Sequence, residues 1–503
     1  MTPLMNAASL IDWDHSYARL PDRFFARVKP TPVRAPGLIR VNDRLAAQLR
    51  LDGKALAAPA GLEVLAGNLV PQNSEPIAMA YAGHQFGHFV PQLGDGRAIL
   101  LGEVIDRENK GYDIQLKGAG RTPFSRGGDG RAALGPVLRE YLVSEAMSAL
   151  GIPSTRALAA VTTGEMVRRT TPSPGAILTR VASSHIRVGT FQYFAARRDG
   201  DAIRMLADYV IARHYPHCTD SPNRYRALLD AIVRGQAELV AKWMLVGFIH
   251  GVMNTDNTSI ACETIDYGPC AFMDAYNPAM VYSSIDGMGR YAFSNQPRIA
   301  QWNLARLAET LLDLLGEEQS VAIREAEAAV EAFPSHFESA YTAGLRRKLG
   351  LFENRPGDLD LAQDLLDSMA KNNADFTLTF RGLCEAGFSS DVVRSEEVEA
   401  LQSLFSNSPE IDAWLERWRG RLCEEGGDPE ARREQMRAAN PLFIPRNHLV
   451  EDVIVAAVDR RDFQPFETLL AVGSTPHEDR PEFRSYTLPP RPEQIVLQTF
   501  CGT

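Results

Sequence analysis

The sequence has no apolar run long enough to cross a membrane. A transmembrane helix needs about 18–20 consecutive apolar residues, and the best candidate, residues 243–249, is followed at once by His250 and Gly251. We also expect no secretory signal and no mitochondrial transit peptide, because Asp12 and Asp14 interrupt the N-terminus and no apolar segment follows the first methionine. The sequence therefore predicts a protein without a membrane partner.

Cysteine is scarce, with six residues in a chain of 503, and no two of them form a CxxC pair. Zinc ribbons are held by such pairs, so the pattern excludes a structural zinc site of that kind. A few scattered cysteines in a long chain are typical of a reducing compartment, and we expect a cytoplasmic protein.

Basic residues are fewer than acidic ones: 53 lysines and arginines stand against 63 aspartates and glutamates, a formal net charge of −10. This balance argues against a nucleic-acid coat, and we expect no nucleic-acid partner. Apolar residues make up 45% of the chain and charged residues 23%, as in ordinary globular proteins. The length is too great for one ordinary domain, so we expect several lobes in a monomeric protein.

Glycine is concentrated in residues 81–135, where it marks tight turns and places where the backbone approaches something closely. The apolar segment 98–104 and the alternating segment 112–117 predict two strands in this region. Apolar residues at three-to-four spacing then predict a helix over 135–150, and Gly151 is a natural stop for it.

Further strands are predicted over 156–163 and 176–181, a long helix over 226–249, and mainly helices after residue 301. The fold class is therefore α+β. We expect five segments: an N-terminal extension (1–75), a β-rich lobe that contains the glycine-rich region (76–195), a helical lobe (196–310), a helical extension of it (311–472) and a tail (473–503).

Two glycine-rich segments could bind phosphate. Residues 94–97 (GDGR) precede the first strand, where glycines let backbone N–H groups approach phosphate oxygens and the arginine adds a bidentate donor. A tight hairpin turn is the alternative for this short motif. Residues 118–131 (GAGRTPFSRGGDGR) combine glycines with three arginines. This combination favours a polyphosphate-binding site over the alternative, a mobile surface loop.

Lys117 ends the second strand, and Glu140 lies 23 residues later on the following helix. A strand lysine paired with a helix glutamate holds the ATP phosphates in kinase folds. A solvated lysine is the alternative, and Glu145 is a second possible partner that helical spacing does not exclude.

Acidic and amide side chains follow the long helix, in residues 250–257 (HGVMNTDN) and then at Asp266 before Tyr267 and Gly268. Aspartate and asparagine supply the hard oxygen ligands that suit Mg²⁺ on a nucleotide, and Asp256 could deprotonate a hydroxyl. Helix capping and turn formation also favour these residues.

His84 and His88 lie four residues apart, a spacing that binds zinc on a helix. The glutamate of an HExxH motif is missing, so we interpret them as structural histidines packed among aromatic residues.

The sequence resembles the protein adenylyltransferase SelO family (selenoprotein O). The resemblance spans residues from about 75 to the C-terminus. It rests on four motifs: YAGHQFGHFVPQLGDGRA, DIQLKGAGRTPFSRGGDGRA, HGVMNTDN with IDYGP, and PLFIPRNHLVE.

The resemblance implies a two-lobed, protein-kinase-like (pseudokinase) fold that binds ATP in a flipped orientation with Mg²⁺ or Mn²⁺. It implies transfer of AMP to serine, threonine or tyrosine hydroxyls of protein substrates. The residue roles that it implies are the nucleotide loop for Gly94, Gly96 and Arg97, the phosphate-binding ion pair for Lys117 and Glu140, triphosphate contacts for Asp129, Gly130, Arg180 and Arg187, the proton acceptor for Asp256, and the metal ligands for Asn257 and Asp266.

Cys501 occupies the third position from the end, where eukaryotic family members carry selenocysteine. The resemblance implies redox control through a disulfide to a cysteine near the site, for which Cys270 is preferred over Cys262. The alternative is an unpaired thiol on a mobile tail.

Two other functions remain as alternatives to AMP transfer. The first is a conventional kinase, but its HRDxxxxN loop places the aspartate five residues before the asparagine, whereas Asp256 and Asn257 are adjacent and position 252 is valine. The second is a non-catalytic nucleotide-binding scaffold, which would not need a full set of catalytic and metal-binding residues.

Overall fold

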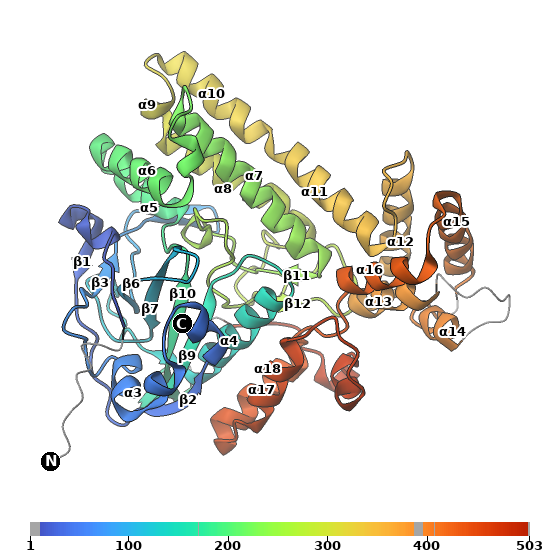
Figure 1. Cartoon of the computed structure of the whole chain (residues 1–503), viewed down its shortest axis with the longest axis horizontal. Helices are drawn as coiled ribbons and strands as arrows, with labels where there is room; N and C mark the ends of the chain where they lie inside the picture. The colour runs from blue at the N-terminus through green and yellow to red at the C-terminus, as the bar shows by residue number, and fades with distance from the viewer. Residues whose placement is uncertain (1–10, 170, 387–395, 407, 501–503) are drawn as a thin grey trace.

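A computed structural model describes residues 11–169, 171–386, 396–406 and 408–500. Figure 1 shows a twisted sheet at one side of the molecule and long helices that extend away from it. The chain is thus a mixed α/β protein in which an antiparallel sheet comes early in the sequence and helices follow.

The main sheet has eight strands, and β6 (Ala98–Ile105), β7 (Gly111–Lys117), β10 (Ser173–Ala182) and β9 (Arg156–Val167) are neighbours in its centre. All four are antiparallel to their neighbours. They cover the four strands predicted from the sequence and extend some of them by several residues. Lys117 stands opposite both Ala98 and Leu178, so the sheet itself fixes the position of this lysine.

The edges of the sheet come from residues before 80. Strand β1 (Phe25–Arg27) pairs with β3 (Ile77–Met79) at one edge, and β2 (Gly37–Val41) pairs with β9 at the other. Thus the segment 1–75 contributes strands to the same sheet as the glycine-rich region. The remaining early elements are α1 (Asp43–Gln48), α2 (Gly53–Ala57), α3 (Pro59–Leu65), the hairpin of β4 (Gly83–Gln85) and β5 (His88–Val90), and β8 (Ala132–Ala133), which pairs with β10.

Helix α4 (Leu134–Ala149) is covered on two faces. One face packs on the sheet, and the other packs against α17 (Asn447–Arg460) and α18 (Gln464–Gly473), with the Tyr141 and Phe466 rings 5.4 Å apart (Figure 1). Gly135 allows this approach, because a Cβ atom there would lie 2.9 Å from Ile454. The helix that carries Glu140 is therefore held on one face by the sheet and on the other by helices about 300 residues further along the chain.

The long helix α7 (Arg224–Leu245) ends earlier than the pattern over 226–249 predicts. Gly247 adopts a left-handed φ of +72°, which stops the helix, and Phe248–Ile249 form strand β11 instead. This strand pairs with β12 (Ala271–Phe272). The loop between the two strands contains Asp256, Asn257 and Asp266, so the short pairing fixes both ends of that loop.

Helices make up most of the rest of the molecule. They are α5 (Val188–Ala195), α6 (Gly200–His214), α8 (Gln296–Thr310), α9 (Leu312–Leu315), α10 (Gln319–Glu331), α11 (Phe333–Lys348), α12 (Asp358–Asn372), α13 (Phe376–Ala386), α14 (Glu396–Ser403), α15 (Pro409–Glu425) and α16 (Pro429–Ala439). Across the described residues, none of the helices combines the length and apolar character that a membrane span requires.

The C-terminal segment returns to the body of the protein. Thr499 is buried, its N–H donates to the carbonyl of Tyr282 (2.8 Å), and its hydroxyl donates to the carbonyl of Pro269 (2.6 Å). Cys501, and with it the predicted disulfide, lies outside the described residues. Its candidate partners are the buried Cys270 and the half-buried Cys262.

Candidate active site

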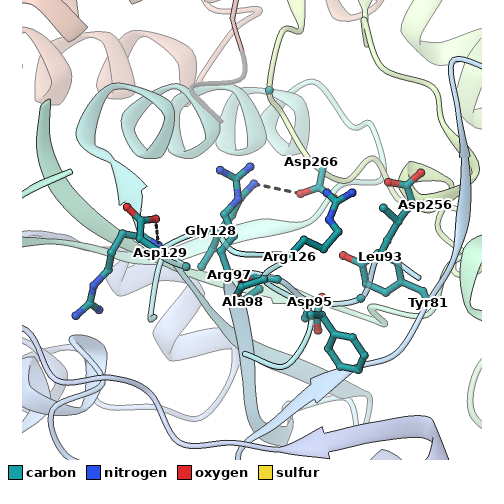
Figure 2. A pocket seen from close by; sticks show the side chains of 18 of the residues that line it. Tyr81, Leu93, Asp95, Arg97, Ala98, Arg126, Gly128, Asp129, Asp256 and Asp266 are labelled. Atoms are coloured by element: carbon teal, nitrogen blue, oxygen red, sulfur yellow. Dashed lines mark hydrogen bonds and ion pairs between the residues drawn. The ribbon is translucent and has the colours of Figure 1, made fainter. Parts of the chain in front are cut away.

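A cavity of about 960 Å³ lies between the glycine-rich loops of the sheet and the loop that joins β11 to β12. Figure 2 shows Asp129 toward one end of it and Asp256 toward the other, with Asp266 between them. The site residues predicted from the sequence that line it are Gly94, Gly96, Arg97, Lys117, Asp129, Gly130, Arg180, Arg187, Asp256, Asn257 and Asp266. Glu140 is buried next to Lys117.

Lys117 and Arg180 share two carboxylates beneath the cavity. The ammonium nitrogen of Lys117 lies 2.5 Å from Glu140 and 3.1 Å from Asp266. The Arg180 guanidinium contacts the same two carboxylates at 2.5 and 2.6 Å. Because each cation bridges both carboxylates, the strand lysine and the helix glutamate are fixed relative to the loop that carries Asp266.

Glu145, the other possible partner of Lys117, lies in a different environment. Its carboxylate accepts two hydrogen bonds from Arg156 (2.7 and 2.8 Å) and one from Asn42 (2.8 Å). The structure thus places Glu140, and not Glu145, against the lysine.

Arg187 completes the cluster from the start of α5. It donates to Asp266 (2.9 Å) and to the backbone carbonyl of Asp256 (2.8 Å), and its guanidinium lies 4.6 Å from the centre of the Tyr81 ring. The cluster of Lys117, Arg180, Arg187, Glu140 and Asp266 thus has three cations and two carboxylates. The buried Asp95 carboxylate lies 4.0 Å from Arg187, so the three cations are matched by three carboxylates on this wall of the cavity.

The carboxyl groups of this cluster stay ionised. Burial alone would raise the pKa of Glu140 and of Asp266, but Arg180 and Lys117 outweigh burial and lower the pKa of both. Burial and the neighbouring Arg180 lower the pKa of Lys117, against the attraction of the two carboxylates. Adding the negative charge of a phosphate would favour the protonated lysine.

Asp256 is buried at the other end of the cavity. Its Oδ2 accepts a hydrogen bond from Gln85 (3.0 Å), whereas its Oδ1 has no hydrogen-bond partner among the described residues. Burial raises the pKa of this carboxyl to about 6. Gly83 allows the close packing here, since a Cβ atom would lie 2.6 Å from Oδ1. A weakly acidic carboxylate that lines the cavity and has one oxygen without a hydrogen bond is suited to accepting a proton.

Asn257 follows directly and donates through Nδ2 to the carbonyl of Val252 (2.9 Å). Asp266 has a left-handed φ of +65°, which is unusual for a residue other than glycine and directs its carboxylate toward three cations. Backbone strain of this kind is often found at functional sites.

The GDGR turn is fixed by contacts with residues that pack against it. Gly94 has a φ of +70°, and a Cβ atom there would lie 2.2 Å from Phe124. Asp95 is buried and accepts hydrogen bonds from the Met79 N–H (3.1 Å) and from Gln115 (3.2 Å). The turn is thus a packed part of the cavity wall as well as a connection between strands.

Asp129 and Gly130 lie away from the ion cluster. Asp129 accepts hydrogen bonds from Arg169 at 2.9 and 3.1 Å and from the Arg131 N–H at 2.9 Å. Gly130 has a φ of +69° and packs against the Gly120 carbonyl. These two residues therefore shape the end of the cavity opposite to Asp256.

Several residues of the site were not selected from the sequence. Gln85 holds Asp256, Asp95 fixes the GDGR turn, and Arg169 holds Asp129. Gln85 and Asp95 lie inside a motif that was already selected from the sequence. Their position in that motif could have identified them as site residues. Nothing in the spacing around Arg169 pointed to the site.

The cavity is strongly cationic. Among the described residues that line it, eight arginines and one lysine stand against four aspartates. In a chain with a net charge of −10, this concentration is local, and it matches the charge of a polyphosphate.

The two discounted histidines lie in the β4–β5 hairpin. The His84 ring lies 4.9 Å from that of Phe89 and 5.2 Å from that of Trp302, and it accepts or donates a hydrogen bond with Gln192. In the described parts of the chain, no group of three or more histidine, cysteine, aspartate or glutamate residues forms a metal site. The ring contacts of His84 agree with the interpretation of a histidine packed among aromatic residues, whereas His88 is exposed.

A sheet lysine paired with a helix glutamate, glycine turns and a cationic cavity are typical of enzymes that bind a nucleotide polyphosphate. Residues 8–473 match the family described as protein adenylyltransferase SelO. The chain belongs to this family and is a nucleotidyltransferase, an enzyme that uses a nucleotide such as ATP and acts on protein substrates.

Relatives with the name protein nucleotidyltransferase YdiU are similar over almost the whole chain. The one from Bradyrhizobium sp. (strain ORS 278) is 62% identical over 491 residues, which cover 98% of this chain and 99% of that protein. The one from Methylorubrum extorquens (strain PA1) is 64% identical over 496 residues, covering 98% and 100%. A third, from Rhodopseudomonas palustris (strain HaA2), is 59% identical over 491 residues, covering 98% and 99%.

Proposed function

We propose that this protein transfers AMP from ATP to serine, threonine or tyrosine hydroxyls of other proteins, with Asp256 as the base. Membership of the SelO family supports the reaction. The observation that carries the residue assignment is the arrangement of the cavity. Its lining is cationic and includes Lys117, Arg180 and Arg187, and the Asp256 carboxylate lies at one end.

The chemistry of the transfer fits this arrangement. The substrate hydroxyl oxygen forms a bond to the α-phosphorus, the bond from that phosphorus to the bridging oxygen breaks, and pyrophosphate leaves with the bonding electron pair. Negative charge grows on the leaving group, where Lys117 and the arginines can stabilise it. Asp256 accepts the proton of the hydroxyl, and its raised pKa suits that role.

We propose that ATP binds in the flipped orientation, with its γ-phosphate toward Arg180 and Arg187. Gly94, Gly96 and Arg97 would contact the nucleotide from the turn, and Asp129 and Gly130 from the opposite loop. The position of Asp129 and Asp256 at opposite ends supports a nucleotide lying along the cavity between them (Figure 2).

Asn257 and Asp266 would hold a divalent cation, Mg²⁺ or Mn²⁺. The donor set fits such an ion, because both residues carry hard oxygen atoms and both line the cavity. When bound, the ion would neutralise charge on the phosphates. Two protein ligands leave further coordination positions for phosphate oxygens and water.

We further propose a kinase-like division of the fold, with residues 76–195 as the nucleotide-binding lobe and residues 196–310 as the lobe that carries the catalytic loop. The pairing of Lys117 with Glu140 supports this division. A conventional kinase reaction remains the second candidate, and the loop around Asp256 departs from the kinase motif that it would require.

A labelling comparison tests the reaction. The purified protein is incubated with Mg²⁺ and ATP labelled on the α-phosphate or on the γ-phosphate, beside an Asp256→Asn variant that keeps the shape of the side chain. We expect protein-bound label from the α-phosphate alone and its loss in the variant. Label from the γ-phosphate alone would identify a kinase and refute AMP transfer.

A further inference from the structure

Large apolar side chains that are strongly exposed gather beside the active-site cavity. Among the described residues, five such side chains have exposed fractions of 61% or more: Met166, Ile285, Met288, Leu497 and Phe500. Met166 and Ile285 line the cavity itself. The other three lie on two segments, residues 283–291 and 495–500, that are hydrogen-bonded to each other.

The contact between these segments is well defined. The Ser284 N–H donates to the Thr499 carbonyl (3.2 Å), and the Thr499 N–H donates to the Tyr282 carbonyl (2.8 Å). Since Thr499 is buried, the adjoining residues of the C-terminal segment are held next to Ile285. We call Ile285, Met288, Leu497 and Phe500 the apolar rim.

The segment that carries the rim is tied to the catalytic loop. The Asp286 carboxylate accepts hydrogen bonds from the N–H groups of Arg290 (2.9 Å) and Tyr291 (2.8 Å). The Tyr291 hydroxyl then donates to Asn254 (2.6 Å), two residues before Asp256. The rim is therefore presented at a fixed place relative to the proposed base.

Exposure of this degree needs a partner to explain it. Single exposed apolar residues are ordinary, but a group of them at one place usually marks an interaction site. The partner that must reach this place is the protein substrate, because its hydroxyl has to come to Asp256 while the rest of its chain lies outside the cavity. A methionine that is 95% exposed, Met288, adapts to differently shaped partners.

We propose that the apolar rim binds the substrate segment around the modified hydroxyl, and that it selects segments in which large apolar side chains flank that residue. Such side chains are accessible mainly in flexible or partly unfolded stretches of a protein, since folded domains bury them. The preferred substrates are thus hydroxyl residues within locally unfolded, apolar sequence. This inference rests on the proposed function and adds a substrate class to it.

A binding experiment tests the rim without requiring catalysis. A fluorescein-labelled peptide with one serine between leucines and phenylalanines is compared with a peptide that has glutamine at those positions. Both are titrated with the full chain and Mg²⁺ in the presence of a non-hydrolysable ATP analogue, and anisotropy is measured. We expect the apolar peptide to bind at least tenfold more tightly.

The variant Met288→Ser/Leu497→Ser should reduce the affinity for the apolar peptide to that of the glutamine peptide. Both side chains are exposed, so the fold and the affinity for the ATP analogue should not change. The matched control is Met205→Ser/Leu359→Ser, which replaces the same residue types at exposed positions on α6 and α12 and should bind like the wild type.

Equal affinity for the two peptides, or undiminished binding by the rim variant, would overturn the proposal. So would a rim variant that alters only self-association in sedimentation velocity, because the rim would then join two copies of the chain. Failure of the α-phosphate labelling would instead refute the proposed function, so the two results are separable.

Discussion

Two regions of the molecule bury positive charge in opposite ways. Beneath the cavity, Lys117 and Arg180 share the carboxylates of Glu140 and Asp266. In the helical extension, the Lys348 ammonium lies 4.2 Å from the centre of the Phe380 ring, and within the described residues it forms no ion pair with a carboxylate. Its pKa is lowered by burial to about 7.

The difference separates a functional charge from a structural one. The paired arginines keep their charge and line a cavity together with Lys117, so they can interact with an incoming anion. Lys348 is partly deprotonated near pH 7, which lowers the cost of its burial, and its amine lies over the Phe376 and Phe380 rings. A buried cation by itself therefore does not indicate a ligand site, whereas several cations on the wall of a cavity with a cationic lining do.

The largest effect is expected from Lys117→Ala, which removes one cation from the cluster. Transfer of the α-phosphate label should fall about a thousandfold in kcat/KM, because the leaving group loses its nearest lysine. The fold should persist, since Arg180 still bridges both carboxylates. The control is Lys110→Ala, whose exposed lysine pairs with Glu108 outside the site. Full activity in Lys117→Ala would show that the site is misplaced.

Arg446→Met provides the second test, on a buried cation that is paired. Arg446 is 1% exposed at the start of α17 and contacts Asp274 (2.5 Å) and Asp375 (2.8 Å). Its loss leaves two carboxylates buried without their cation, so the free energy of unfolding should fall by about 3–5 kcal/mol. Denaturant unfolding followed by circular dichroism measures this change. An unchanged midpoint would mean that these carboxylates do not depend on the arginine.

Lys348→Met should stabilise the protein, in contrast to Arg446→Met. The lysine has a pKa of about 7 in the folded state and near 10.5 in the unfolded state. Between these values the unfolded chain binds more protons, so the stability of the wild type should rise with pH from about 7 to about 10.5. At pH 7, Lys348→Met should raise the free energy of unfolding by about 2–3 kcal/mol, after the loss of the cation–π contacts is subtracted.

The same substitution should also remove that contribution to the pH slope, which unfolding curves at several pH values would reveal. Lys371→Met is a control, because the lysine is exposed and pairs with Glu410 on the surface. A pH slope that persists unchanged in Lys348→Met would assign it to another group.

The smallest effect is expected at an exposed pair. Arg417 lies 2.8 Å from Asp364, and both side chains are about half exposed. Water and salt screen such a pair, so Arg417→Ala should change the free energy of unfolding by less than about 1 kcal/mol. If Arg417→Ala lowered the free energy of unfolding as much as Arg446→Met, burial would not explain a difference between the two arginines.

The sequence predicted the elements that are marked by local patterns. The strand around Lys117 alternates apolar and polar residues, and the helix around Glu140 has a regular apolar spacing, so both were found close to their observed bounds. The end of α7 was missed because Trp243–Ile249 is apolar throughout, and a single glycine turn converts its last residues to a strand.

The choice between Glu140 and Glu145 depended on contacts distant in sequence. Helical spacing allows either residue to face Lys117, and Arg156 decides the matter by binding Glu145. The role of Gln85 depends likewise on a contact with Asp256, 171 residues later. Side-chain partners of this kind follow from the assembled fold, and local periodicity does not encode them.

The packing of α4 against α17 and α18 has a consequence for how the enzyme is made. A ribosome releases Glu140 long before residues 447–473, which cover the outer face of α4. Until those last helices emerge, Tyr141 and Leu142 lack their apolar cover and the nucleotide cavity lacks a firmly held helix. A nascent or prematurely terminated chain should therefore be inactive, so that modification of other proteins begins only after translation is complete.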